Sequence, residues 1–346
     1  MMDTAMNALR MGVAWTTDPP TVCLRIAGQD AFSTLDRVCP ADLFVRDGQV
    51  RPTVLLNEQG QVFADVYIGQ DDDGYLLISE GPSAETLVEH VRSHAASGSD
   101  LTIEDLTASH SLISIQGPYA WELIGEVLGP DLIGLPYLYF YRTQDILCLR
   151  GGKTGEYGYD LFVPQASVAD FQARLVDRGA AFDLERVGLP TLEQAALENG
   201  FFNIRREGKH NLTPMELGIL WRVSYRKEYV GSQALLEERA RGPIRRATTM
   251  MSEFEVSEGD PVFWADVVIG SVLSAGYSPM ANAHVSIAIL DKPYYHAGVE
   301  EYTAGVERVN VTTVSPPVLV NRSLYINPQR HTYATRGRDN FPAIYE

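Results

Sequence analysis

Cysteine is scarce in this sequence, and its three cysteines, Cys23, Cys39 and Cys148, are widely spaced. An odd, scattered set cannot build the disulfide framework of a small secreted protein, nor a zinc site made of cysteine alone. Each thiol is therefore expected to be a small buried side chain in a reducing compartment. Residues 1–20 contain no basic segment followed by an apolar run, so we predict no signal peptide and a cytoplasmic location.

Long apolar runs are missing as well, because no stretch reaches the roughly 18 consecutive apolar residues of a membrane span. Basic residues are outnumbered: 28 Lys and Arg stand against 45 Asp and Glu, a formal net charge of −17. The dense basic clusters are short, at Arg205-Arg206 and at 241–246. Nucleic-acid and anionic-membrane surfaces need clustered positive charge. We therefore expect neither nucleic acid nor a membrane as a partner.

The sequence has 346 residues, 45% of them hydrophobic and 21% charged, which is ordinary globular composition and enough for two or three structural units. Strand-like segments alternate with single helical segments through about residue 242, which indicates an α+β architecture. The predicted strands are 20–27, 51–56, 62–68, 75–79, 112–115, 145–149 and 159–163. The predicted helices are 29–38, 82–96, a helix after 116–118 that ends at 128, 167–178 and 191–199.

The pattern changes after Gly242, where short apolar runs are separated by Gly, Pro and Asp turns and no long helical period is left. This pattern predicts a small β-barrel or sandwich over about 244–317. The expected organisation is therefore an α+β region over 1–242, a β-domain over 243–317 and a tail over 318–346 that the pattern does not assign.

Two local patterns resemble a phosphate loop and a metal site, and neither is predicted to be one. The glycine-rich segment 151–156 has the wrong spacing for a phosphate loop and lies between two strands, so a hairpin turn is expected. His90 and His94 are four residues apart on a predicted helix, but no third ligand accompanies them. A solvated helix face is expected there, and no metal site is predicted.

Two carboxylates lie at positions where a negative charge is unfavourable unless it is solvated, paired or used in a function. Asp65 lies inside the apolar strand 62–68, where it either faces solvent or has a function, and the strand pattern alone does not decide between them. Glu198 lies near the C-terminal end of a predicted helix, where the helix dipole disfavours negative charge. Glu198 is therefore expected to have a partner.

Several motifs, taken together and in order over about residues 28–292, resemble the glycine-cleavage T-protein family, the tetrahydrofolate-dependent aminomethyltransferases. The motifs are Leu55-Leu56-Asn57-Glu58-Gln59-Gly60 followed by Asp65, Ile115-Gln116-Gly117-Pro118, Thr154-Gly155-Glu156-Tyr157-Gly158-Tyr159-Asp160-Leu161, Leu197-Glu198-Asn199-Gly200, Thr213-Pro214-Met215-Glu216 with Trp221 and then 229–235, and Gly276-Tyr277-Ser278-Pro279 through Ser286-Ile287-Ala288.

The resemblance implies a three-lobed ring, in which two interleaved α+β folate-binding lobes fill 1–242 and a β-barrel follows. It implies tetrahydrofolate as cofactor, Asp65 as the catalytic aspartate and Glu198 as the carboxylate that binds the pterin. A carboxylate suits the pterin because it accepts two parallel N–H donors. The further folate-binding positions implied by the resemblance are Thr154, Glu156, Tyr157 and Trp221.

The sequence also departs from the family pattern. The paired aspartates of the family are Ala64 and Asp65 here, its tyrosine before the TGE motif is Lys153, the arginine of its LRLEAG motif is Ala196, and its N-terminal stretch is largely absent. These departures predict a small molecule rather than a lipoyl carrier protein as the second partner. The iron–sulfur assembly branch is disfavoured because its KGCYxGQE stretch is not visible at 199–206.

The leading hypothesis is therefore a tetrahydrofolate-dependent transferase of a methyl, hydroxymethyl or aminomethyl unit that acts on a small molecule. Two alternatives stay open: the aminomethyltransferase of the glycine cleavage system, and a folate-binding regulatory protein without catalysis. The sequence does not identify the second substrate, the direction of transfer or the oligomeric state.

Overall fold

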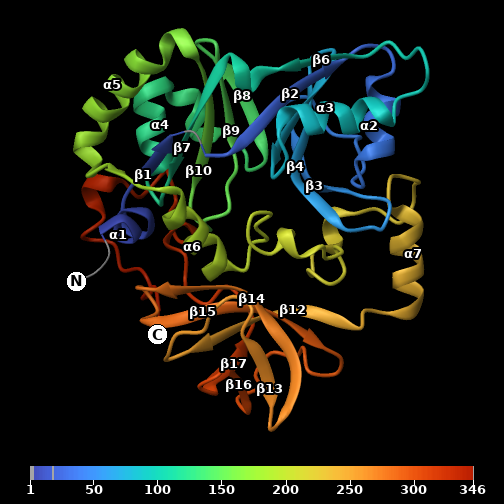
Figure 1. The fold of residues 1–346 in the computed structure, drawn as a ribbon. Helices are drawn as coiled ribbons and strands as arrows, with labels where there is room; N and C mark the ends of the chain where they lie inside the picture. Colours follow the sequence, from blue (N-terminus) through green and yellow to red (C-terminus); the bar gives the residue numbers. More distant parts are fainter. Residues whose placement is uncertain (1–3, 18, 346) are drawn as a thin grey trace.

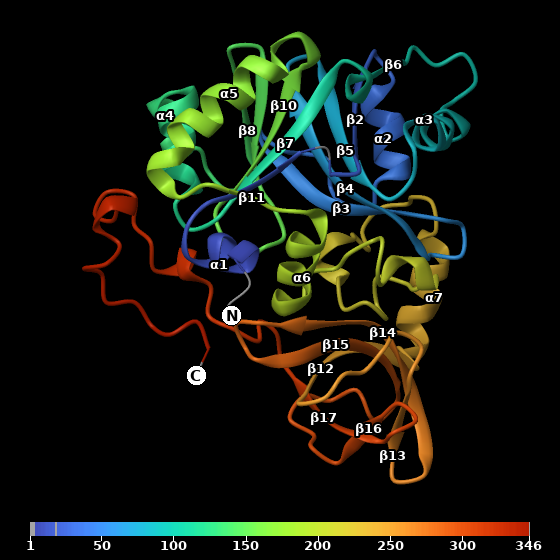
Figure 2. The ribbon, with the colours of Figure 1, turned by 60° about the vertical axis from the view of Figure 1, so that its left-hand side comes forward.

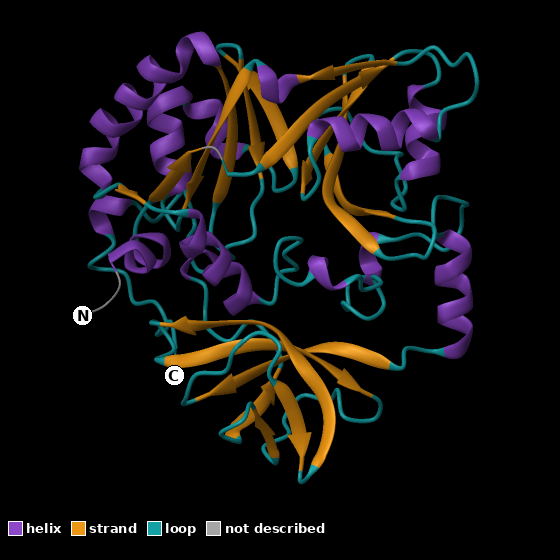
Figure 3. Ribbon diagram, viewed as in Figure 1, coloured by secondary structure: helices purple, strands orange, loops and turns teal. Residues whose placement is uncertain are grey.

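The computed structural model describes residues 4–17 and 19–345. Two lobes that each contain a β-sheet lie side by side, and a β-barrel lies beneath them, with helix α6 (Leu189–Asn199) and irregular segments between (Figures 1 and 3). This arrangement confirms the expected α+β fold with two sheet-containing lobes and a C-terminal barrel. None of the helices in the described residues has the length and apolar character needed to cross a bilayer.

The first lobe is built on a five-stranded antiparallel sheet with two helices on one face. The strand order is β3 (Val50–Leu56), β4 (Val62–Asp71), β5 (Gly74–Glu80), β2 (Thr21–Ala27) and β6 (Thr102–Asp105). Helices α2 (Ala31–Val38) and α3 (Ala84–Ser93) bury Leu35 and Leu87 against alternate strand residues such as Leu77. This face of the sheet is therefore closed to solvent and to ligands.

The second lobe is built on a six-stranded sheet, in which β1 pairs in parallel with β11 and the other pairs are antiparallel. The order is β11 (Glu185–Arg186), β1 (Ala14–Thr17), β7 (His110–Gln116), β10 (Gly158–Pro164), β9 (Ile146–Arg150) and β8 (Tyr139–Thr143). Helices α4 (Ala120–Leu128) and α5 (Val168–Gly179) cover its outer face. Because β1 belongs to this sheet while β2 to β6 build the other, the two lobes are interleaved along the chain.

The barrel closes with β12 (Arg245–Ser252) paired to both β15 (Ala283–Asp291) and β17 (Val309–Val314). The remaining strands are β14 (Val267–Ser278), β13 (Pro261–Trp264) and β16 (Tyr302–Ala304). Helix α7 (Ser232–Arg241) leads into the barrel from the lobes (Figure 1). The tail after the barrel returns to the second lobe beside α1 (Thr4–Met11), as Figure 2 shows.

The structure agrees with every strand and helix that the sequence predicts, to within a few residues at the ends. In the described part of the two lobes it adds six helices and strands that the sequence pattern did not reveal, namely α1, β1, β6, β8, β11 and α7. Five of them are short or poorly patterned, and α7 is mostly polar, so only tertiary packing distinguishes them from loops. The three cysteines are free and buried, as expected.

The inner faces of the two sheets pack against each other through an apolar layer. Leu76 and Ile78 of the first sheet meet Leu112, Leu149 and Phe162 of the second. These residues alternate along their strands with residues that face the helices, as the period of two in a strand requires. The relative position of the lobes therefore depends on this layer.

Leu149→Ala is expected to lower the free energy of unfolding by about 2–5 kcal/mol, because Leu149 is fully buried in the inter-sheet layer and its removal leaves a cavity. Urea unfolding followed by circular dichroism measures the change. The control is Val176→Ala on α5, where the side chain is 53% exposed and a change below about 0.5 kcal/mol is expected. Equal effects of the two substitutions would contradict the importance of the layer.

Candidate functional site

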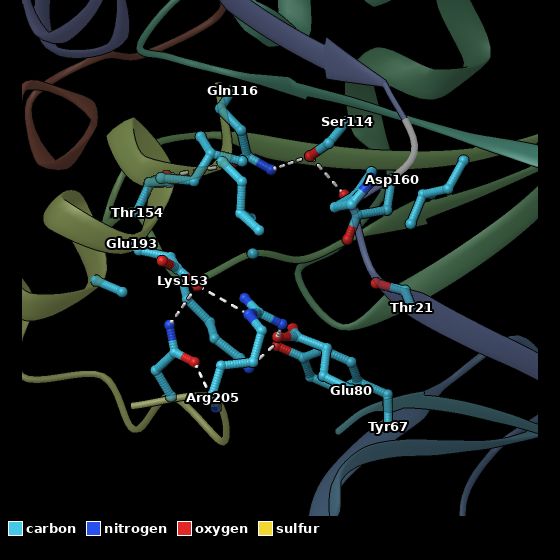
Figure 4. A pocket seen from close by; sticks show the side chains of 17 residues that line it. Thr21, Tyr67, Glu80, Ser114, Gln116, Lys153, Thr154, Asp160, Glu193 and Arg205 are labelled. Atoms are coloured by element: carbon cyan, nitrogen blue, oxygen red, sulfur yellow. Dashed lines mark hydrogen bonds and ion pairs between the residues drawn. The ribbon is translucent and has the colours of Figure 1, made fainter. Parts of the chain in front are cut away.

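A polar cavity lies where the inter-sheet layer ends, between the two lobes and helix α6 (Figure 4). The strand faces that carry Leu112, Phe162 and Ile78 in the layer carry Ser114, Asp160 and Glu80 two residues further along. The same alternation that builds the apolar layer therefore aims polar side chains into one space. The polar side chains that line the cavity are Thr21, Tyr67, Glu80, Ser114, Gln116, Lys153, Thr154, Asp160, Glu193, Asn203 and Arg205.

One chain of ion pairs crosses the cavity wall. The Lys153 ammonium lies 2.7 Å from Asp65 Oδ2 and 2.9 Å from Glu80 Oε1. Arg205 then joins Glu80 to Glu193, at 2.7 Å and 2.8 Å. Burial opposes the charge on Lys153, but Asp65 and Glu80 outweigh it and raise the pKa of the ammonium above its ordinary value. The wall therefore presents fixed charges of both signs.

Asp65 is held by two cations and lies behind the cavity wall. Asp65 is directly opposite Glu80 in the β4–β5 pairing, so the antiparallel register brings the two carboxylates close to each other. The Lys153 ammonium lies between them and contacts both. The other oxygen of Asp65 accepts a 2.6 Å hydrogen bond from Arg222, and both side chains are 4% exposed. Burial alone would raise the pKa of Asp65, but Lys153 and Arg222 hold it below its ordinary value. Asp65 is thus a permanent anion near neutral pH.

A second chain consists of hydrogen bonds between uncharged side chains and ends on the carboxyl group of Asp160. The Thr154 hydroxyl donates to Gln116 Oε1 at 3.0 Å, Gln116 Nε2 donates to Ser114 Oγ at 2.8 Å, and the Ser114 hydroxyl donates to Asp160 Oδ1 at 2.6 Å. Burial raises the pKa of Asp160 to about 6, although the Ser114 hydrogen bond opposes the shift. In each of these hydrogen bonds the acceptor belongs to the residue that is nearer to Asp160 in the chain of bonds, so the chain ends with a donor to Asp160.

Glycines make room for the Gln116 side chain. Gly152 has φ +128°, and a Cβ there would lie 2.8 Å from Gln116 Oε1. A Cβ on Gly158 would overlap both the Gly151 carbonyl and Gln116. Gly152 and Gly158 are therefore required by the close approach of Gln116, and Gly152 also by a backbone conformation that L-residues rarely adopt. As the sequence predicts, the segment joins two strands, β9 and β10.

Glu198 has the partner that its place in the helix required, and that partner is Arg10. The Arg10 guanidinium lies 2.6 Å from Glu198 Oε2, and both side chains are fully buried. The same guanidinium contacts the Thr154 carbonyl at 2.5 Å, Asn321 Oδ1 at 2.8 Å and Glu156 at 3.3 Å. This cluster ties together α1, the 151–158 segment, α6 and the tail.

Helix α6 therefore has two polar faces. Leu192, Glu193 and Ala196 line the cavity. Glu198 follows Glu193 by five residues and Ala196 by two, which at 3.6 residues per turn places it roughly on the opposite side of the helix, toward Arg10. The structure brings Asp65, Lys153 and Thr154 together at or behind the wall of the cavity. Glu198 lies on the side of helix α6 that faces away from the cavity.

The other predicted folate-binding residues lie apart from one another. Glu156 accepts hydrogen bonds from the Ser323 backbone and hydroxyl, and burial raises its pKa despite Arg10. The Tyr157 ring packs under Arg150, with its hydroxyl 3.4 Å from the Ile326 carbonyl. Both face the tail. Trp221 is 67% exposed on the outer surface beside Arg222. Of the predicted folate-binding residues, only Thr154 lines the cavity.

Sequence reasoning missed several residues of the site, among them Glu80, Glu193 and Arg205 at the cavity. Glu80 ends a strand and Arg205 lies in an irregular segment, so neither had a pattern to mark it. Asp160 had one usable signal, because it belongs to the 154–161 motif and interrupts an apolar strand. In the described residues no group of three or more His, Cys, Asp or Glu is placed to hold a metal ion.

Asp65→Asn is expected to lower the free energy of unfolding at pH 7.5 by about 3–5 kcal/mol, because it leaves Arg222 buried without a carboxylate. The deficit should shrink as the pH falls below about 4, since a carboxyl with a lowered pKa stabilises the fold only while ionised. Urea unfolding at several pH values is the measurement.

The matched variant is Asp65→Asn with Arg222→Met, which removes both charges. It should be more stable than Asp65→Asn alone, because the uncompensated cation is gone. A loss below about 1 kcal/mol in the single variant would show that the pair is not important for stability.

Comparisons with known proteins point to one family. A model of the GCVT N-terminal domain matches residues 5–227. Relatives include the mitochondrial aminomethyltransferase of Pisum sativum, 27% identical over 342 residues that cover 91% of this chain and 81% of that protein. The aminomethyltransferase of Rubrobacter xylanophilus is 29% identical over 270 residues, which cover 75% of this chain and 71% of its own.

A solved structure shows the same fold. The glycine cleavage system aminomethyltransferase T from Bartonella henselae matches with a TM-score of 0.81 at 21% identity, over 90% of this chain and 88% of that one. The matched range 5–227 of the family model contains every residue that lines the cavity.

Proposed function

Because the chain belongs to the family of the GCVT N-terminal domain, we propose that it is a tetrahydrofolate-dependent one-carbon transferase that works in the cavity between the lobes. The observation that carries the proposal is the convergence of Lys153, Thr154 and Asp160 on this cavity. All three lie in or beside the motif at 154–161 on which the family resemblance rests. The relatives named aminomethyltransferase support an enzyme over a folate-binding protein without catalysis.

The residues at the cavity fit such a substrate chemically. Tetrahydrofolate offers N–H donors, and Gln116 and Asp160 offer acceptor oxygens to the cavity. Lys153 and Arg205 offer cations to a carboxylate of either substrate. Bound tetrahydrofolate would supply the nitrogen that carries the one-carbon unit. The protein supplies fixed charges around it.

Asp65 has a defined part in this proposal. It does not line the cavity but contacts Lys153, which does. Asp65 therefore holds the Lys153 ammonium at the cavity wall and keeps it charged. In this arrangement the aspartate acts on the reaction through the position of Lys153, which replaces the tyrosine of the family pattern.

The role of Glu198 in pterin binding is a proposal from the resemblance, and the structure sets a condition on it. Glu198 already accepts from the Arg10 guanidinium, whose planar N–C–N donors resemble the donor edge of a pterin. A pterin bound by Glu198 must therefore take the place of Arg10.

Glu198→Gln is expected to weaken tetrahydrofolate binding by about 30- to 1,000-fold, because a charged bidentate contact is lost. Titration calorimetry measures the affinity. Glu193→Gln is the matched control on the cavity face of the same helix, and its affinity should stay within a few-fold of the wild type. A larger loss of tetrahydrofolate affinity in Glu193→Gln than in Glu198→Gln would place the pterin against the cavity face of α6.

We further propose that the one-carbon donor or acceptor is a small molecule, as the departures at Ala64 and Lys153 suggest. A specific observation favours a second candidate: the relatives are named aminomethyltransferase, and the solved structure with this fold belongs to the glycine cleavage system. The comparisons lend no support to excluding a carrier protein.

An assay with two arms decides between these candidates. One arm contains tetrahydrofolate and methylated oxygen, sulfur or nitrogen compounds, and the other contains a lipoylated carrier protein and ammonia. Mass spectrometry of the folates is expected to show a new one-carbon folate in the first arm and little turnover in the second. Strong turnover with the carrier would make aminomethyl transfer the function.

A further inference from the structure

Among the described residues three carboxylates line the cavity, and one of the three lacks a cation. Glu80 is paired with Lys153 and Arg205, and Glu193 is paired with Arg205. Among the described residues, Asp160 has no Lys, Arg or His within ion-pair distance and accepts a hydrogen bond only from Ser114. Of the three described carboxylates at the cavity, Asp160 is thus the one whose charge is not matched by a cation.

The surroundings of Asp160 fix one oxygen and leave the other available. Asp160 is directly opposite Ser114 in the β7–β10 pairing, so the strand register itself brings the hydroxyl to Oδ1. Gln116 and Thr154 behind Ser114 direct that hydroxyl as a donor. Oδ2 has no hydrogen-bond partner among the described residues and belongs to a side chain at the cavity wall.

We infer that Asp160 is the proton acceptor of the proposed transfer, an assignment that rests on the one-carbon function proposed above. Whatever the donor, a new bond joins the carbon to a folate nitrogen that carries a hydrogen. That nitrogen contributes its electron pair to the carbon, the bond from the carbon to its former partner breaks, and the partner keeps those electrons. Asp160 Oδ2 takes the proton that the nitrogen gives up.

The electrostatics suit this role at physiological pH. The charged groups that face Asp160 are Glu80 on β5, which raises its pKa, and Lys153 on the 151–158 segment, which lowers it. On β9 the Cys148 thiol is neutral, because burial raises its pKa. With a pKa of about 6, Asp160 is ionised and still basic enough to hold a proton near neutral pH. Asp65, whose pKa Lys153 and Arg222 hold below its ordinary value, is a weaker base.

Formaldehyde is a suitable probe, because it is the simplest one-carbon electrophile and its addition to tetrahydrofolate needs the same deprotonation of nitrogen. Wild-type protein is expected to accelerate this addition above the uncatalysed rate, with a rate that rises through about pH 6 and then levels. Asp160→Asn should lower the accelerated rate by at least about 100-fold and abolish the rise with pH. Asp170→Asn, an exposed aspartate on α5, is the matched control and should change neither.

Two measurements do not depend on activity. Carbon-13 NMR of aspartate-labelled protein should show a carboxyl that titrates near pH 6, absent in Asp160→Asn and moved upward in Ser114→Ala, which loses the hydrogen bond that lowers the pKa. The melting temperature of Asp160→Asn at pH 7.5 should be no lower than that of the wild type. The fold raises this pKa, so ionisation of Asp160 lowers the stability of the native state progressively between about pH 4 and pH 6, and the whole loss is present at pH 7.5.

The outcomes separate the two proposals. If tetrahydrofolate does not bind the wild type in calorimetry, the proposed function fails and the inference fails with it. If it binds and Asp160→Asn reacts at the wild-type rate, or if the carboxyl titrates near pH 4, only the assignment of Asp160 is overturned. A parallel fall of affinity and rate would make Asp160 a folate ligand and would likewise overturn its role as proton acceptor.

Discussion

The Lys153 ammonium lies between two carboxylates that strand pairing places side by side, and much of the site depends on this contact. Asp65 and Glu80 are direct partners on β4 and β5, so without a cation between them their repulsion would oppose the pairing of the two strands. Lys153 comes from the other lobe. The same ion pairs therefore relieve the repulsion, join the lobes and place a positive charge at the cavity wall.

The remaining contacts extend this arrangement outward. Arg205 continues the chain from Glu80 to Glu193 on α6, and Arg222 secures the far oxygen of Asp65. On the other side of α6, Arg10 gathers Glu198, Glu156 and the tail residue Asn321. Helix α6 is thus held between two charged clusters, one open to the cavity and one fully buried.

The tail, which the sequence pattern left unassigned, has a structural role. Ser323 satisfies the Glu156 carboxylate, and the Tyr333 ring packs against Tyr119 in the core of the second lobe. The tail starts from the end of the barrel and reaches the 151–158 segment, so it connects the barrel to the second lobe. Buried charges are favourable only when acceptors surround them, and the two terminal nitrogens of Arg10 find acceptors on the 151–158 segment, on α6 and on the tail.

The family, the α+β architecture and the barrel followed from the sequence, because alternation, turn residues and ordered motifs are local properties of the chain. The sequence also indicated that Glu198 needs a partner, since a negative charge at a helix C-terminus is costly alone, and it left open whether Asp65 faces solvent or has a function. It could not supply the partners of these carboxylates. Lys153, Arg222 and Arg10 are 88, 157 and 188 residues away from the carboxylates they meet.

The contrast between Asp65 and Asp160 shows what only the tertiary structure decided. Both are aspartates in apolar strands of family motifs, and the sequence singled out Asp65. In the folded protein Asp65 receives two cations and Asp160 receives a single hydroxyl, so the pKa of one carboxyl falls and that of the other rises. A pKa depends on burial and on the charges within a few ångströms, and those neighbours are set by the packing of strands and segments far apart in the chain.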